Sequence, residues 1–282
     1  MDSSLTFHPA ERYSSDELGE LFTRAYTGYP VPVQIDQAGL ETMVITYDID
    51  LGASRVAVLG GEPVAIALLS VRDRRGWIGG MGVVPARRRQ GIGGAVMRAA
   101  LDAARRRAIH TVDLEVLTQN TPALLIYNAL GFKHRRMLDM WVRAADSTFP
   151  LPPRDEVQPL EVDGCLAAFD DFHSVVPPWQ RDLPSLRQMA GTLRALGILK
   201  GRQVQAYLLY RSDGSSVWIA DVATAPGQRT AMIESLLRAL IRDRSGSSIR
   251  LVNLPQDDPA SGVMYRIGAA VEMQQHEMTL EL

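Results

Sequence analysis

Three arginines and a cluster of glycines precede an alanine-rich segment in the sequence PARRRQGIGGAVMRAAL, residues 85–101. From Ile92 onward the apolar residues recur at helical spacing, which predicts a helix with one buried face. Glycines at a helix start leave the backbone N–H groups open to a ligand, because no Cβ stands in the way. These donors, the helix dipole and the arginine charges together favour an anion at this turn.

Other interpretations of the turn are open on spacing alone. In one, the glycines only shape the turn and the arginines form a solvated face. A dinucleotide-binding turn would need Gly-x-Gly-x-x-Gly directly after a strand, but Val96 takes the place of the third glycine. A nucleotide triphosphate loop would need Gly-Lys-Ser or Gly-Lys-Thr, which the turn lacks. The pattern Arg88-x-x-Gly91-x-Gly93, behind a strand that ends in Val-Pro, is more specific than these.

The segment GVVPARRRQGIGG resembles the acetyl-coenzyme A signature of the GNAT superfamily of N-acetyltransferases. That signature is Arg or Gln, two residues, Gly, one residue, then Gly or Ala. Residues 114–132, LEVLTQNTPALLIYNALGF, are similar to the family's next motif, in which a strand and an Asn lead into a helix that carries Tyr and ends in Gly-Phe. The resemblance implies transfer of an acetyl group from acetyl-CoA to a small-molecule or peptide amine, by direct attack in a ternary complex. A non-catalytic acyl-CoA-binding or regulatory module is the alternative.

The resemblance also implies where the coenzyme binds. Backbone N–H groups from Arg89 through Gly94 would hold the pyrophosphate, and the strand end at Met81–Val83 would bind the pantetheine arm and the acetyl carbonyl. Gly79, Gly80 and Gly82 in the strand at residues 76–84 fit a bulge where two strands splay apart. Asn120 would contact the coenzyme, cap the next helix, or do both. The full set of predicted coenzyme-binding residues is Met81, Gly82, Val83, Arg88, Arg89, Gln90, Gly91, Ile92, Gly93, Gly94 and Asn120.

Two residues are candidates for proton transfer. Tyr127 matches the tyrosine that protonates the departing thiolate in the family, since a phenol with a pKa of about 10 stays protonated at neutral pH. On spacing alone, Tyr127 also fits a packed helical residue. Glu115, on the strand before Asn120, is the leading candidate for the base, although a strand glutamate can equally face solvent.

The loop RAYTGYPVPVQ, residues 24–34, lies where the family builds part of its acceptor wall. Its tyrosines, Tyr26 and Tyr29, would either contact the acceptor or form a packed turn. No motif in the sequence selects one acceptor among small amines, peptide N-termini, lysines and antibiotics.

The composition bounds the remaining partners. A formal net charge of −2 gives no global attraction to nucleic acid or to an anionic membrane, so neither is expected. The polar, acidic start and the single cysteine, Cys165, favour a cytoplasmic setting. The chain is expected to be a monomer or a homodimer. We expect no metal site, because the histidines have no ligand spacing. They are His8, His110, His134, His173 and His276.

The elements that must position these residues recur in two halves. The predicted fold class is α/β (α+β), with two GNAT-like domains that each have a central mixed, mostly antiparallel twisted sheet flanked by helices. We place a catalytic domain at residues 1–146, a proline-rich linker at 147–156 and a degenerate domain at 157–282. Trp77-Ile78 stands eight residues before Pro85, and Trp218-Ile219 stands eight residues before Pro226, which indicates an internal duplication.

Alignment of the halves predicts that the second one has lost the coenzyme site. Met232 and Glu234 stand opposite Gly91 and Gly93, and Arg229 is the only matching charge, opposite Arg88. Asp257 and Met264 stand opposite Asn120 and Tyr127, and Tyr265 is one residue out of register. We therefore expect one coenzyme A per chain.

Overall fold

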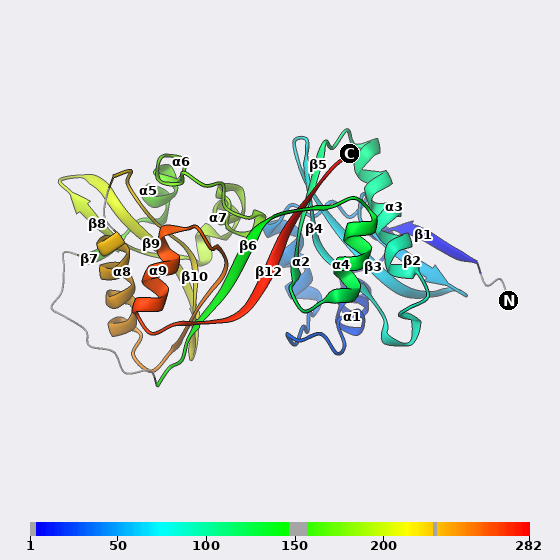
Figure 1. The fold of residues 1–282 in the computed structure, drawn as a ribbon, viewed down its shortest axis with the longest axis horizontal. Coiled ribbons are helices and arrows are strands. Elements are labelled where there is room, and N and C mark those ends of the chain that lie inside the picture. Colours follow the sequence, from blue (N-terminus) through cyan, green and yellow to red (C-terminus); the bar gives the residue numbers. More distant parts are fainter. Residues whose placement is uncertain (1–3, 147–156, 228–229) are drawn as a thin grey trace. The chain divides into compact units, whose positions relative to one another are not determined.

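The computed structural model describes residues 4–146, 157–227 and 230–282, and the chain folds into two compact units (Figure 1). Unit 1 comprises Met1–Arg135 and Glu277–Leu282, and unit 2 comprises Arg136–His276. The units therefore divide at residue 135 and not at the predicted boundary of 146. The predicted linker at 147–156 lies outside the described residues.

Unit 1 is built on a mixed sheet in which only one neighbouring pair of its first five strands is parallel. The strands are β1 (Leu5–Pro9), β2 (Arg55–Leu59), β3 (Glu62–Arg72), β4 (Arg75–Val83) and β5 (Thr111–Leu117). β1 to β4 pair antiparallel in sequence order, whereas β4 and β5 run parallel. The β4–β5 pairing ends at Ile78 and Leu114, and Gly79 forms a bulge in β4 against β3. The predicted bulge is therefore present, and the two strands part just beyond it.

The helices of unit 1 cover both faces of β4. They are α1 (Ser15–Ala25), α2 (Gln37–Thr46), α3 (Ile92–Arg106) and α4 (Thr121–Ala129), with short 3-10 turns η1 (Ala10–Arg12) and η2 (Pro85–Arg87). A Cβ at Gly82 would meet Ala25 of α1, whereas the Met81 sulfur lies on the side of Gly93 in α3. Because successive strand residues face opposite sides, α1 and α3 pack on opposite faces of the sheet.

Unit 2 repeats this order of elements, as the duplication predicts (Figure 1). Its strands are β7 (Val157–Leu160), β8 (Arg194–Lys200), β9 (Gln203–Asp213), β10 (Ser216–Thr224) and β11 (Ser248–Pro255). Its helices and 3-10 turns are α5 (Val162–Ala167), α6 (Phe169–Phe172), η3 (Trp179–Arg181), α7 (Leu183–Met189), η4 (Ala190–Thr192), α8 (Thr230–Asp243) and α9 (Pro259–Arg266). β7 to β10 pair antiparallel and β10–β11 is parallel, which matches unit 1 strand for strand. β7 was not predicted from the sequence, because it is only four residues long and contains Pro159.

The two remaining strands, β6 and β12, are not confined to the halves in which they were predicted. β6 (Lys133–Arg143) was expected to close the first half, but its residues from 136 onward belong to unit 2, where they pair with β11. β12 (Ala270–Glu281) ends in unit 1, where Met278 is buried in the core and the Leu282 N–H donates to the His110 carbonyl. Unit 1 therefore contains the C-terminal segment of the chain, and unit 2 begins with residues that were predicted to belong to the first domain. No helix among the described residues is long and apolar enough to span a membrane.

Candidate active site

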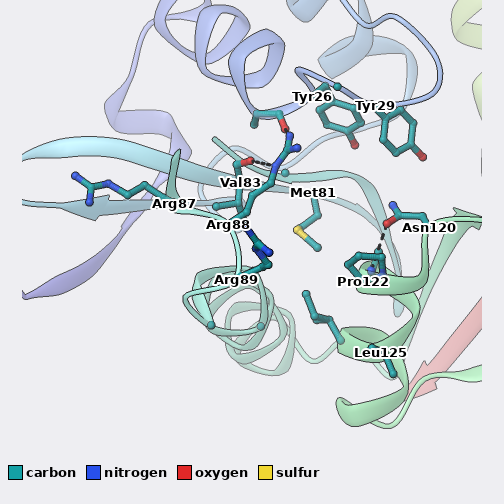
Figure 2. A pocket seen from close by; sticks show the side chains of 18 of the residues that line it. Tyr26, Tyr29, Met81, Val83, Arg87, Arg88, Arg89, Asn120, Pro122 and Leu125 are labelled. Carbon is teal, nitrogen blue, oxygen red and sulfur yellow. Dashed lines mark hydrogen bonds between the residues drawn. The ribbon is translucent and has the colours of Figure 1, made fainter. Parts of the chain in front are cut away.

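A cavity of about 850 Å³ opens in unit 1 beside the end of β4. Its lining residues come from segments 25–30, 81–83, 87–98 and 119–130, so α1, β4, α3 and α4 all contribute. Figure 2 shows Met81 near the middle of this wall, with Tyr26 and Tyr29 on one side of it and Pro122 and Leu125 on the other. The cavity therefore joins both sequence motifs.

The turn before α3 is shaped to present backbone donors. Arg89 and Gly91 both have positive φ, at 60° and 77°, and Gly91 is the N-cap of α3. No side chain caps this helix, whereas side chains of Ser14, Asp36 and Asn120 cap α1, α2 and α4. The first N–H groups of a helix have no partner within it, so those at the start of α3 are available to a ligand. A backbone concavity of this kind binds anions.

The charge around the cavity is of one sign. Four of its lining residues are arginines, and none of the lining residues that the structure describes is an aspartate or a glutamate. Arg87, Arg88 and Arg89 point in three different directions (Figure 2). Arg98 lies one helical turn after Gly94, and its guanidinium is 3.5 Å from the position that a Gly94 Cβ would occupy. Arg98 is not among the predicted coenzyme-binding residues, although its i+4 spacing from Gly94 is a signal that it shares the site.

Arg88 is held by the protein itself. Its Nε donates to the Val83 carbonyl at 3.0 Å, and its Nη2 donates to the carbonyls of Ala25 and Thr27 at 3.0 and 2.7 Å. The guanidinium therefore ties the end of α1 to the end of β4. Arg88 lines the cavity, as predicted. Its three hydrogen bonds go to backbone carbonyls, so the guanidinium holds the cavity wall in place and is not directed at an anion.

The inner end of the cavity carries hydroxyl and amide groups. The Tyr26 hydroxyl faces the backbone of Met81, and the Tyr29 hydroxyl faces the Asn120 side chain. Asn120 also caps α4, because its Oδ1 accepts from the Ala123 N–H at 3.3 Å. Asn120 therefore caps the helix, and it also lines the cavity, while its contact with the coenzyme stays a prediction.

Tyr127 lies behind this end and is only 5% exposed. Its ring contacts Phe132, and its helix neighbour Ile126 lines the cavity. Burial, with Tyr26 and Tyr29 close by, raises the pKa of Tyr127 well above its ordinary value. The phenol therefore keeps its proton at neutral pH and sits in a cluster of three tyrosines.

Three other predicted residues do not line the cavity. One Glu115 carboxylate oxygen accepts a hydrogen bond of 2.7 Å from the Trp77 indole, so the Glu115 side chain links β5 to β4 and does not face the cavity. Ile92 is buried in the core of unit 1, and the Gln90 amide donates to the Ala86 carbonyl. The other predicted coenzyme-binding residues all line the cavity: Met81, Gly82, Val83, Arg88, Arg89, Gly91, Gly93, Gly94 and Asn120.

In unit 2, side chains occupy the position that corresponds to the acyl end of the cavity in unit 1. Its bulge falls at Ala220, so Asp221 takes the place that Gly80 has in unit 1. Asp221 is fully buried and receives hydrogen bonds from Arg181 at 3.0 Å and Tyr207 at 2.8 Å, with His173 at 3.3 Å. Burial alone would raise the Asp221 pKa, but these partners hold it below its ordinary value.

Arg181 also spans the opening between the parted strands of unit 2. The β10–β11 pairing ends at Ile219 and Leu251, as the β4–β5 pairing ends in unit 1. Arg181 donates to the Ala220 carbonyl on β10 and to the Asn253 carbonyl on β11. A side chain of the protein therefore occupies the gap between the two strands.

The helix start in unit 2 differs as well. Glu234, predicted opposite Gly93, pairs with Arg238 and Arg266 at 2.5 and 2.9 Å. The N-cap of α9 is Asp258, one residue after the predicted Asp257, whereas Met264 is buried and Tyr265 is 75% exposed. Arg229 lies outside the described residues. Within the described ranges, no group of three or more His, Cys, Asp or Glu could hold a metal ion.

Comparison with known proteins agrees with this geometry. Residues 16–132 match the acetyltransferase (GNAT) family. A GCN5-related N-acetyltransferase from Sphaerobacter thermophilus is 16% identical, with 100% of this chain and 96% of that chain covered and a TM-score of 0.72. A tandem GNAT protein from the clavulanic acid biosynthesis pathway is 17% identical, with 99% and 98% covered and a TM-score of 0.71. A putative acetyltransferase from Pyrococcus horikoshii is 16% identical, with 100% and 90% covered and a TM-score of 0.69.

Comparison with curated protein sequences finds no match. The family match and the shared fold nevertheless agree with the two motifs and with the repeated units. Residues 16–132 therefore match the GNAT family, and the chain as a whole, with its two units, has the fold of a solved tandem GNAT protein.

Proposed function

We propose that unit 1 transfers an acetyl group from acetyl-CoA to the nitrogen of an amine. The observation that carries the proposal is the uncapped start of α3, which opens into a cavity lined by four arginines and no acid among the described residues. Coenzyme A has a pyrophosphate, a 3′-phosphate and a long, mostly neutral arm. A cationic end and an apolar wall in one cavity suit a ligand of this kind.

The residues present fit the coenzyme. Gly91 has nothing within 4 Å of its missing Cβ, so its backbone is open to a ligand, and Gly93 and Gly94 follow it with their N–H groups free of a side-chain cap. These groups would hold the pyrophosphate, while Arg89 and Arg98 supply charge for the phosphates. Pro122, Leu125 and Ile126 on α4 form the wall beside the arm.

The acyl end would lie at the residues beyond the bulge. Backbone groups of Met81–Val83, on a strand that has parted from β5, would bind the arm and the thioester carbonyl. A backbone N–H that donates to this oxygen stabilises the negative charge that forms there during attack.

The reaction then needs one proton donor. The amine nitrogen attacks the carbonyl carbon, the carbon–sulfur bond breaks, and the sulfur leaves as a thiolate that takes the Tyr127 proton. The proton lost by the attacking nitrogen restores the phenol through water. The raised pKa of Tyr127 keeps this proton in place until the thiolate forms. The acceptor is a small-molecule or peptide amine.

We further propose one coenzyme A per chain. In unit 2 the strand gap holds Arg181 and the bulge carries Asp221, so a pantetheine arm would have to displace a buried, fully bonded ion pair. Glu234 would also place a carboxylate beside a pyrophosphate.

Two measurements on the full chain test the proposal. Calorimetric titration with acetyl-CoA is expected to saturate at one equivalent per chain, and a panel of amines is expected to release free thiol from acetyl-CoA. Binding without thiol release from any amine class would favour the alternative, a non-catalytic acyl-CoA-binding module. Failure to bind would reject both functions.

A further inference from the structure

The cavity of unit 1 ends at a stack of aromatic rings from α1. The rings of Phe22 and Tyr26 are stacked with centroids 4.5 Å apart and an angle of 16° between their planes. Tyr29 meets Tyr26 edge-on at 5.1 Å. Phe22 is 3% exposed, so the stack is anchored in the core, while Tyr26 lines the cavity.

The stack leaves no room on this face of β4. A Cβ at Gly80 would lie 2.5 Å from the Phe22 ring and 3.4 Å from the Tyr26 hydroxyl oxygen. A Cβ at Gly82 would lie 2.8 Å from the Ala25 Cβ. One methyl group is therefore already too large for the space between α1 and the strand at these two positions.

The Tyr26 hydroxyl marks where this closed face meets the acyl end. It lies against the β4 backbone, 3.4 Å from the position of a Gly80 Cβ and beside Met81, the first residue of the segment to which we assign the thioester carbonyl. A carbonyl bound at Met81 would direct its alkyl substituent against the Tyr26 ring or the rings stacked on it. The space left for that substituent is set by Tyr26 and Phe22.

We propose that Tyr26, backed by Phe22, is the residue that limits the transferred acyl group to acetyl. The inference rests on the proposed function, because it takes the carbonyl to be bound at Met81–Val83. Each methylene beyond acetyl must push the Tyr26 ring away from Phe22 and Met81. One methylene of misfit in an apolar site changes affinity by about 10–200-fold.

Equilibrium binding tests this without knowledge of the acceptor. The full chain is titrated with free coenzyme A, acetyl-CoA and propionyl-CoA, and the free coenzyme serves as the baseline for each variant. Wild-type protein is expected to bind acetyl-CoA at least about 10-fold more tightly than propionyl-CoA. Tyr26→Ala, and the more conservative Tyr26→Leu, should reduce that ratio to below about threefold while free coenzyme A binds as before.

Tyr29→Phe is the matched control, because it keeps the ring that meets Tyr26 edge-on and removes only a hydroxyl group from the cavity. It should keep the wild-type ratio. Equal binding of acetyl-CoA and propionyl-CoA by wild-type protein would overturn the inference, as would a Tyr26 variant that binds free coenzyme A and keeps the ratio. A wild-type chain that binds none of the three ligands would instead overturn the proposed function.

Discussion

Replacing Gly94 by aspartate should weaken coenzyme binding without unfolding the protein. Gly94 is the third residue of α3, and a Cβ there would meet the Arg98 guanidinium at 3.5 Å and Ile126 at 4.0 Å, both ordinary contact distances. Gly93 is a poorer choice, because its Cβ would lie 3.1 Å from Ile126 and would disturb the packing of α3 on α4. The Gly94 site therefore separates binding from folding.

The two effects of Gly94→Asp have opposite signs. A carboxylate in the first turn of a helix stabilises it by about 0.3–1 kcal/mol, and replacing glycine by aspartate in a helix contributes roughly 0.3 kcal/mol more. The same carboxylate would lie about 5 Å from a bound pyrophosphate, where like charges repel by about 3 kcal/mol at an effective dielectric constant near 20. It would also pair with Arg98 and remove that charge from the site.

We therefore expect the affinity for acetyl-CoA to fall by at least about 30-fold, with an unfolding temperature equal to or above that of wild type. Gly94→Asn has nearly the same size without the charge, and it should lose less than about fivefold. Calorimetric titration and a thermal melt measure both quantities. Wild-type affinity in Gly94→Asp would show that the pyrophosphate does not lie at this turn.

Three further predictions concern other parts of the chain. Tyr127→Phe should lower kcat by about 10–1000-fold with acetyl-CoA affinity nearly unchanged, and a normal kcat would remove Tyr127 from the proton transfer. Arg88→Lys should bind acetyl-CoA about as weakly as Arg88→Ala, because an ammonium does not replace the planar fork that joins three carbonyls; rescue by lysine would make Arg88 a phosphate ligand. In unit 2, burial alone would lower the His173 pKa, but Asp221 beside it raises the pKa above its ordinary value. Its contribution to unfolding free energy is therefore full below about pH 6.5 and is lost as the pH rises through the folded-state pKa. Urea unfolding from pH 6 to pH 9 should show this loss in wild type and a flatter profile in His173→Gln; parallel profiles would refute the role of the pair.

Much of the fold follows from local sequence. The glycines of β4 predict its bulge because a strand rarely carries three glycines without one, and the spacing of Trp77 and Trp218 from the following prolines predicts the repeat. The allocation of β6 and β12 was not predictable in this way. The residue pattern of a strand indicates which of its faces is buried but not which neighbouring strand it pairs with.

The parts of the site that are formed by backbone groups were predictable from the sequence, whereas the parts formed by side chains were less so. Gly91 lines the cavity because its φ of 77° at the turn favours glycine, whatever the surroundings. Arg88 and Glu115 turn to other partners, since a long or charged side chain follows the hydrogen bonds that its neighbours offer. The assignment of Tyr26 to the acyl end needed the stacking on Phe22, which depends on how α1 packs against β4.

The central claim is that acetyl-CoA bound in this cavity gives its acetyl group to an amine nitrogen. The most direct measurement incubates the full chain with an amine library and acetyl-CoA labelled with ¹³C in the acetyl group, then seeks labelled amides by mass spectrometry. We expect at least one labelled amide that forms with wild-type protein and at a much lower rate with Gly94→Asp. Labelled amides that form equally fast with Gly94→Asp, or acetyl-CoA that binds and yields no labelled amide with any amine class, would contradict the account.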